Sequence, residues 1–321
     1  MPRKTDPTRQ QLAALAAIDD PSTPEARALV RKALRGRSGH VAASAAELLA
    51  QEGLADAVPE LLAALERFYT DPVKRDPGCV AKLAILTALD RLDLPDPAPF
   101  LAASTYQQLE PAWGPPEDTA VSLRARAALA LGRVFTDEAL VALGAALGDP
   151  APHVRSAAAE ALQERGGGAA AALLALRVRL GDEDPVARGD CMGALVRLSP
   201  ERGVAMLAPL LRDPDIGERE LAALSLGESR QPEALAALVA WLDRVVLETE
   251  RALAIAAIGA HRSEAAQRVL LELVEDGSLR DVERAARALA RQGATLDQVR
   301  GVVVRDADRV GIVEEAFADQ R

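Results

Sequence analysis

A column of basic residues recurs along the chain at the start of successive helical stretches. It comprises Lys82, Arg124, Arg155, Arg188, Arg219 and Arg251. Such a row could bind the phosphates of a nucleic acid. Carboxylates, however, precede several of these residues within the same turn, at Asp149, Asp184 and Asp213. Because arginine and a carboxylate can pair through two parallel hydrogen bonds, we expect the column to form a structural ladder of ion pairs rather than a phosphate site.

A second group of residues suited to binding lies between positions 68 and 118, where most of the aromatic residues gather. The candidate partner-binding residues are Tyr69, Phe100, Tyr106, Glu110, Trp113, Glu117 and Asp118. Tyrosine and tryptophan are favoured interface anchors, and loops carry function more often than scaffold helices do. Two interpretations stay open. The segment binds a partner, or its aromatic side chains fill a gap where the stack of helices bends.

No other residues are spaced for catalysis or for holding a cofactor. Cys79 and Cys191 are far apart in the sequence and predict neither a metal site nor a disulfide. The histidines fall in separate helical stretches, at His40, His153 and His261. The glycines at 166–168 have no lysine after them and no strand before them, unlike a phosphate-binding loop. We therefore expect no metal, no cofactor and no enzymatic activity.

The elements that carry these residues repeat along the chain. A leucine or isoleucine marks one register position in each repeat, at Leu49, Leu89, Leu131, Leu162, Leu195, Leu226, Ile258 and Leu289. From Leu131 onward these marks are 31 to 33 residues apart, a period typical of stacked helical hairpins. One hairpin cannot bury its apolar face alone. The pattern therefore predicts an all-α fold, an α-solenoid of about eight to nine antiparallel helix pairs.

The stretch DPAPHVRSAAAEAL at 149–162 resembles the HEAT repeat, specifically the short HEAT-like repeats also found in phycobilisome lyases. Weaker copies lie at 123–131, 184–195 and 213–226. The resemblance implies that the marked helices line the concave face and that the acids and arginines form an inter-repeat ladder. It also implies an alternative function, that of a bilin-lyase-like enzyme or enzyme subunit. The paired His-Glu dipeptides of the iron-binding HEAT-type hydroxylases do not occur in this sequence, so that activity is not implied.

On the marked helices, the positions six before, two before and one after the mark are expected to face outward. In four repeats they are Ser156, Glu160 and Gln163; Gly189, Gly193 and Val196; Glu220, Leu224 and Gly227; Ala252, Ala256 and Gly259. This face is small and neutral to acidic, which suits a partner's helix or peptide and weighs against a nucleic acid duplex. The glycines that follow the marks are expected to end their helices, as at Gly132, Gly227 and Gly259.

Composition narrows the function classes further. The formal net charge is −10, which disfavours a general nucleic-acid binder. Aromatic residues make up only 2% of the chain, so the core must be built of alanine, leucine and valine. The N-terminal stretch lacks the cleavage site of a signal peptide, and no apolar run has the length of a membrane span. We expect a cytoplasmic protein with no membrane contact.

We interpret residues 1–321 as a single HEAT-like solenoid. Its terminal caps are expected at 1–37 and 294–321, and inserted loops at 68–79 and 93–118. The leading hypothesis is a non-enzymatic scaffold or adaptor that binds a protein or peptide with its concave groove and its aromatic loops. The alternatives are the bilin-lyase-like enzyme and nucleic-acid binding along the arginine column, and we expect a nucleic-acid partner least.

Overall fold

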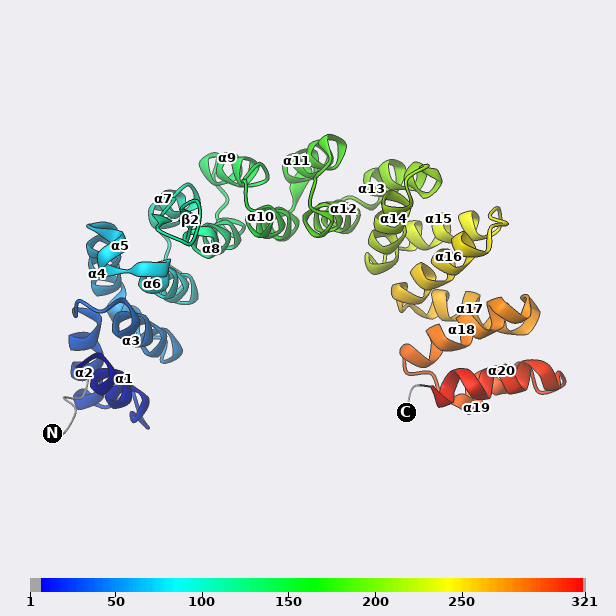
Figure 1. The fold of residues 1–321 in the computed structure, drawn as a ribbon, viewed down its shortest axis with the longest axis horizontal. Helices are drawn as coiled ribbons and strands as arrows, with labels where there is room; N and C mark the ends of the chain where they lie inside the picture. Colours follow the sequence, from blue (N-terminus) through cyan, green and yellow to red (C-terminus); the bar gives the residue numbers. More distant parts are fainter. Residues whose placement is uncertain (1–6, 320–321) are drawn as a thin grey trace. The chain divides into compact units, whose positions relative to one another are not determined.

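The computed structural model describes residues 7–319, and these are almost entirely helical (Figure 1). The chain divides into two compact units between Arg165 and Gly166. Each unit is a stack of helix pairs, which confirms the predicted α-solenoid. Residues 1–6 of the predicted N-terminal cap and residues 320–321 of the C-terminal cap lie outside the described residues.

In the first unit the marked helices pack side by side in one row (Figure 1). They are α3 (Gly39–Gln51), α6 (Val80–Arg91), α8 (Val121–Leu131) and α10 (Pro152–Arg165). A second row of helices packs against one side of this first row. It consists of α4 (Val58–Tyr69), α7 (Ala98–Ser104) and α9 (Asp137–Ala146). The unit opens with α1 (Pro7–Ala16) and α2 (Pro24–Leu34), and the 3₁₀ turn η1 (Ala55–Ala57) precedes α4.

The second unit repeats this arrangement with fewer interruptions. Its marked helices are α12 (Pro185–Leu198), α14 (Ile216–Glu228), α16 (Glu248–His261) and α18 (Leu279–Arg291). The covering helices are α11 (Gly167–Leu180), α13 (Pro200–Leu207) with its 3₁₀ extension η3 (Ala208–Arg212), α15 (Pro232–Leu242) and α17 (Glu264–Asp276). The last pair consists of α19 (Leu296–Gly301) and α20 (Ala307–Ala318). Side chains or prolines at the N-termini stabilise many of these short helices, as where Asp184 accepts the backbone N–H groups of Val186 and Ala187.

The register marks form the core, as the sequence predicts. The side chains at four successive marks have no exposed surface, at Leu131, Leu162, Leu195 and Leu226. The residues four positions earlier are also buried, at Ala127, Ala158, Cys191 and Ala222. Small residues in that column let neighbouring helices approach closely. The shared apolar seam of the repeats therefore runs through the core of each unit and contributes to its hydrophobic burial.

The outward-facing prediction is wrong at two of the four residues named for the position after the mark, whereas Gln163 and Gly259 are partly exposed. Val196 and Gly227 are buried there, and so is Gly193, two before its mark. A Cβ on Gly227 would lie 2.3 Å from the carbonyl oxygen of Ala257 on the next marked helix. Gly227 therefore serves close helix packing inside α14 instead of ending the helix. Gly132 does end its helix, as the C-cap of α8, and it also faces the next helix, with a Cβ position 2.9 Å from the carbonyl oxygen of Ala161.

The two segments expected to be inserted loops are more ordered than the sequence predicts. The first holds the end of α4, a single turn α5 (Pro72–Arg75) and the 3₁₀ turn η2 (Pro77–Cys79). The second holds α7 and a short antiparallel hairpin of β1 (Leu109–Glu110) and β2 (Glu117–Asp118). Within residues 7–319, none of the helices combines the length and the apolar composition that crossing a bilayer requires.

Candidate binding site

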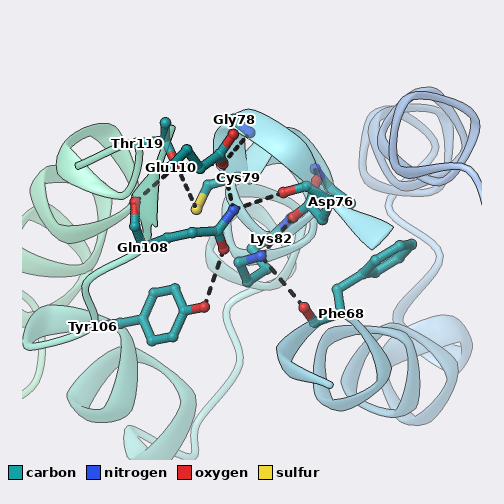
Figure 2. A network of polar contacts seen from close by, with 10 residues as sticks. Phe68, Asp76, Gly78, Cys79, Lys82, Tyr106, Gln108, Glu110 and Thr119 are labelled. Atoms are coloured by element: carbon teal, nitrogen blue, oxygen red, sulfur yellow. Dashed lines mark hydrogen bonds and ion pairs between the residues drawn. The ribbon is translucent and has the colours of Figure 1, made fainter. Parts of the chain in front are cut away.

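A buried ion pair joins the first inserted segment to α6. The carboxylate of Asp76 lies 2.9 Å from Nζ of Lys82, and neither side chain has exposed surface (Figure 2). Asp76 also accepts the backbone N–H groups of Ala81 and Lys82 at 2.7 and 3.0 Å, so it caps the helix. Nζ of Lys82 donates in addition to the carbonyl of Phe68 at 3.4 Å. These bonds offset the large cost of removing both charges from water.

The local backbone explains how a carboxylate six residues before a lysine can meet it inside the protein. Gly78 and Cys79 both have left-handed backbones, with φ of 73° and 55°. Two consecutive residues of this kind turn the chain sharply before α6 begins, which directs Asp76 back over the first turn of the helix. Glycine adopts this conformation readily, whereas a cysteine does so at a cost that the surrounding contacts must offset.

The hairpin is tied to this ion pair by Gln108 and Glu110. Gln108 Nε2 donates to the carbonyl of Asp76 at 2.9 Å and to Oε1 of Glu110 at 2.7 Å (Figure 2). The same Glu110 oxygen accepts the backbone N–H of Gly78 and the hydroxyl of Thr119, each at 2.7 Å. Burial alone would raise the pKa of Glu110, but these hydrogen bonds to the ionised form hold it below its usual value.

Two tyrosines cover the buried lysine. The rings of Tyr69 and Tyr106 meet edge to face with centroids 4.8 Å apart. Nζ of Lys82 lies 5.9 Å and 5.6 Å from these two centroids, within range of cation–π attraction. The hydroxyl of Tyr106 also donates to Oε1 of Gln108 at 3.1 Å. Burial raises the pKa of both tyrosines to about 12, and burial likewise raises the pKa of Cys79.

The other end of the hairpin is fixed by an arginine of the basic column. Arg124 Nη1 lies 2.6 Å from the carboxylate of Asp118, while its Nε and Nη2 bond the two oxygens of Asp149 at 2.7 and 3.1 Å. Asp118 in turn accepts the backbone N–H groups of Gln108 and Ala120. Burial would raise the pKa of Asp118, but these hydrogen bonds and the charge of Arg124 lower it. Both strands of the hairpin therefore stand on a rigid polar base.

The predicted partner-binding residues fall into two groups. Tyr69 and Tyr106 are half-buried in the network and Phe100, at 2% exposure, packs in the core, so Phe100 has no surface to offer a partner. Glu110 and Asp118 hold the hairpin in place. Trp113 at the hairpin tip is fully exposed, and Glu117 is exposed beside it. The segment thus has features of both interpretations. Aromatic residues at its base fill space between the helices, and residues at its tip are accessible to a partner.

The sequence pattern does not identify several residues of this hydrogen-bonded network. Asp76 and Gln108 sit in segments without helical periodicity, and Thr119 resembles an ordinary helix-start residue. One signal was present: Lys82 is the single lysine in a column otherwise occupied by arginines or apolar residues. A primary ammonium is a compact charge that fits a closed cavity, whereas a guanidinium requires a planar space.

The remaining basic column forms a ladder, but its acidic partners lie one repeat further along than predicted. Arg188 pairs with Glu218 at 2.5 Å, Arg219 with Glu250 at 3.8 Å, and Arg251 with Asp281 at 2.9 Å. Arg155 donates to the carbonyls of Asp149 and Pro150 at 2.8 and 3.0 Å. The predicted partners Asp184 and Asp213 instead accept backbone N–H groups of their own turns.

A groove runs over the marked helices next to the network. It has a volume of about 500 Å³. Its walls come from Ala43, Glu47 and Gln51 on α3, from Leu83, Ala84, Thr87 and Arg91 on α6, and from Ser122 and Leu123 on α8. Gly78, Cys79 and Thr119 form the rest of its lining, so the base of the hairpin borders this groove.

Comparison with known proteins agrees with this architecture. The family model for HEAT repeats matches residues 117–185 and 172–249. Residues 117–249 of the chain carry HEAT repeats. The matched stretch of HEAT repeats includes β2 and the helices from α8 to α15. No curated protein matches the sequence.

Solved structures resemble this chain only distantly. One chain in the structure of the complex of CpcE and CpcF of phycocyanin lyase from Nostoc sp. PCC7120 is 18% identical to this chain. The match covers 95% of this chain and 97% of that chain, with a TM-score of 0.35. YibA of Escherichia coli is 16% identical, with 99% and 98% covered and a TM-score of 0.36. Human deoxyhypusine hydroxylase is 20% identical, with 79% and 96% covered and a TM-score of 0.30. None of these likenesses transfers an activity to this chain.

Proposed function

We propose that this protein is a non-enzymatic scaffold that captures a protein or peptide with the hairpin at 109–118 and the groove over α3, α6 and α8. One observation carries the proposal. Trp113 is fully exposed, yet the hairpin that bears it stands on the bonds of Glu110 and Asp118. An exposed aromatic side chain on a rigid base loses little conformational entropy when a partner covers it, which is the property of an interface anchor.

The groove supports the same proposal. Its volume of about 500 Å³ lies in the range of natural binding clefts. Glu47 and Arg91 supply opposite charges on its two helical walls, and neither forms an ion pair within residues 7–319. A peptide backbone or polar side chain entering the groove would therefore meet both a hydrogen-bond acceptor and a donor.

The basic column does not favour the nucleic-acid alternative. Lys82 and Arg124 are buried, and Arg188, Arg219 and Arg251 expose at most a quarter of their side chains. Their positive charges face carboxylates of their own or the next repeat, or carbonyls of nearby turns. Such pairing removes the unneutralised surface charge on which phosphate binding depends.

The experiment is affinity capture from the source cells with the full chain as bait. Trp113→Ala should lose the captured partner, because the exposed indole is the proposed anchor. Phe135→Ala is the matched control, since Phe135 is an exposed aromatic residue (75%) elsewhere in the first unit. Equal capture by wild type and Trp113→Ala would remove the hairpin from the binding surface. Loss with both variants would show that exposed aromatic surface, not this site, retains the partner.

A further inference from the structure

The second unit contains a groove between α12 and α14, two marked helices that pack against each other (Figure 1). Its volume is about 410 Å³. From α12 it is lined by Pro185, Val186, Gly189, Asp190, Gly193 and Arg197, and from α14 by Leu221, Leu224, Ser225 and Glu228. The spacing of three and four residues on each helix means that one face of each helix forms one wall.

Part of the floor and walls of this groove is apolar. Gly189 leaves α12 without a side chain at the floor, where a Cβ would lie 3.5 Å from Leu221. Over Gly193 lies the guanidinium of Arg197, whose Nη1 is 3.1 Å from the position of a Cβ there. Val186 is 67% exposed and Leu224 is 41% exposed. Covering two such side chains with another apolar surface releases their hydration water, which favours binding.

The rim of the groove is acidic. Asp190 and Glu228 line it, and Glu220 lies one turn before Leu224 on α14. All three are exposed, and within residues 7–319 they form neither an ion pair nor a side-chain hydrogen bond. Glu218 on the same helix, in contrast, is engaged by Arg188. Arg197 is the one cation in the lining, and it already interacts within the chain.

We infer that the α12–α14 groove binds a cationic amphipathic helix of a partner protein. Apolar side chains of that helix cover Val186 and Leu224, while its lysines or arginines reach Asp190, Glu220 and Glu228. Glu220 and Glu228 are eight residues apart, about 12 Å along α14, so cations two turns apart on the partner match them. The inference rests on the scaffold function proposed above, but it concerns another unit and does not involve Trp113.

The acidic rim disfavours other classes of binding partner. Phosphates of a nucleic acid and the headgroups of an anionic membrane would be repelled by three unpaired carboxylates. A second copy of this chain carries a net charge of −10 and would bring like charges together at the same rim. A cationic segment alone gains both from the apolar walls and from the charges.

The probe is a fluorescent synthetic peptide of about 14 residues, roughly 20 Å long as a helix, with leucine on one face and lysine on the other. Fluorescence anisotropy should show binding to the full chain that weakens as salt rises. Glu220→Lys/Glu228→Lys should raise the Kd at least about tenfold, because two attractive charges become repulsive. Leu224→Ser should weaken binding while leaving its salt dependence unchanged.

The matched control is Glu233→Lys/Glu272→Lys, which makes the same charge change at exposed positions of α15 and α17. It should bind the peptide almost like wild type. Equal weakening by both double variants would mean that net charge alone attracts the peptide, and absence of binding to wild type would also overturn the inference. Dimerisation of the wild type that Glu220→Lys/Glu228→Lys abolishes would assign the groove to a second copy instead.

Trp113→Ala separates this inference from the proposed function. The variant should bind the peptide as tightly as wild type while losing the partner that the hairpin captures. If the peptide binds as expected but Trp113→Ala captures the partner as well as wild type does, the hairpin proposal is wrong and the groove inference stands. If Trp113→Ala loses the partner but wild type does not bind the peptide, the groove inference is wrong and the hairpin proposal stands.

Discussion

The two units use their basic column in different ways. In the second unit, arginines on successive helices bond acids one repeat away, and each pair keeps some contact with water. In the first unit, at the inserted segments, a lysine occupies the column and bonds an acid from its own repeat, fully buried. A regular ladder fixes the angle between repeats, whereas the buried pair fixes an irregular loop. Where the repeat rhythm breaks, the same position therefore stabilises local structure and supports a projecting hairpin.

The largest expected effect comes from breaking the buried pair. Lys82→Ala leaves the carboxylate of Asp76 buried without its counter-charge, so the free energy of unfolding should fall by about 3–5 kcal/mol. Urea denaturation followed by circular dichroism measures this loss. Lys74→Ala, at an exposed position of the same segment, is the control and should change stability by no more than about 0.5 kcal/mol.

A double variant tests whether the uncompensated buried charge causes that loss of stability. Lys82→Met/Asp76→Asn removes both charges and should recover part of the stability, because an uncompensated buried charge is the main cost. If the single and double variants are equally unstable, packing or helix capping by Asp76 dominates instead.

The next effect is a pH dependence confined to the first unit. The chain has only two tyrosines, Tyr69 and Tyr106, and both cover Lys82. Their pKa is about 12 in the folded state against 10.0 when unperturbed. A raised pKa means that the folded state holds the proton more tightly. The associated stability is therefore complete below pH 10 and is lost as pH rises from 10 toward 12.

Ultraviolet absorbance of the tyrosinate form measures this directly. In the native protein it should begin to rise only well above pH 10, together with a loss of helical circular dichroism. In urea the same groups should titrate near 10. Titration near 10 with all helices intact would show that the tyrosines are not buried against the lysine.

The parts of the fold governed by periodicity could be predicted from the sequence. Leu162 and Leu195 are buried because the 31–33-residue period places one apolar side chain per repeat on a common seam. The basic column was visible for the same reason. Its partners were not, since Glu218 is 30 residues from Arg188 and only the packing of α12 on α14 brings them together.

The candidate site was predictable in location but not in detail. The aromatic residues showed that 68–118 differs from the other repeats, yet the sequence could not separate Phe100 in the core from Trp113 on the surface. That distinction depends on a hairpin of two-residue strands, too short for an alternating pattern. The glutamine–glutamate contact that supports it joins side chains whose meeting depends on the turn at Gly78.

The smallest expected effects distinguish members of the ladder in the second unit. Asp281 is 3% exposed and bonds Arg251 at 2.9 Å, and although burial would raise its pKa, the bonds from Arg251 and Ser278 lower it. Asp281→Asn should therefore lower the free energy of unfolding by about 1–2 kcal/mol. This loss should be seen at pH values above 3.8, where the carboxylate of wild type is ionised in both the folded and the unfolded state.

Glu250→Gln should lower the free energy of unfolding by no more than about 0.5 kcal/mol, since the pair of Glu250 with Arg219 spans 3.8 Å and keeps some contact with water. Urea denaturation in low and high salt measures both. Equal costs for the two variants would mean that burial of the acid does not set the strength of a rung, and the contrast drawn between Lys82 and the arginines would then lose its physical basis.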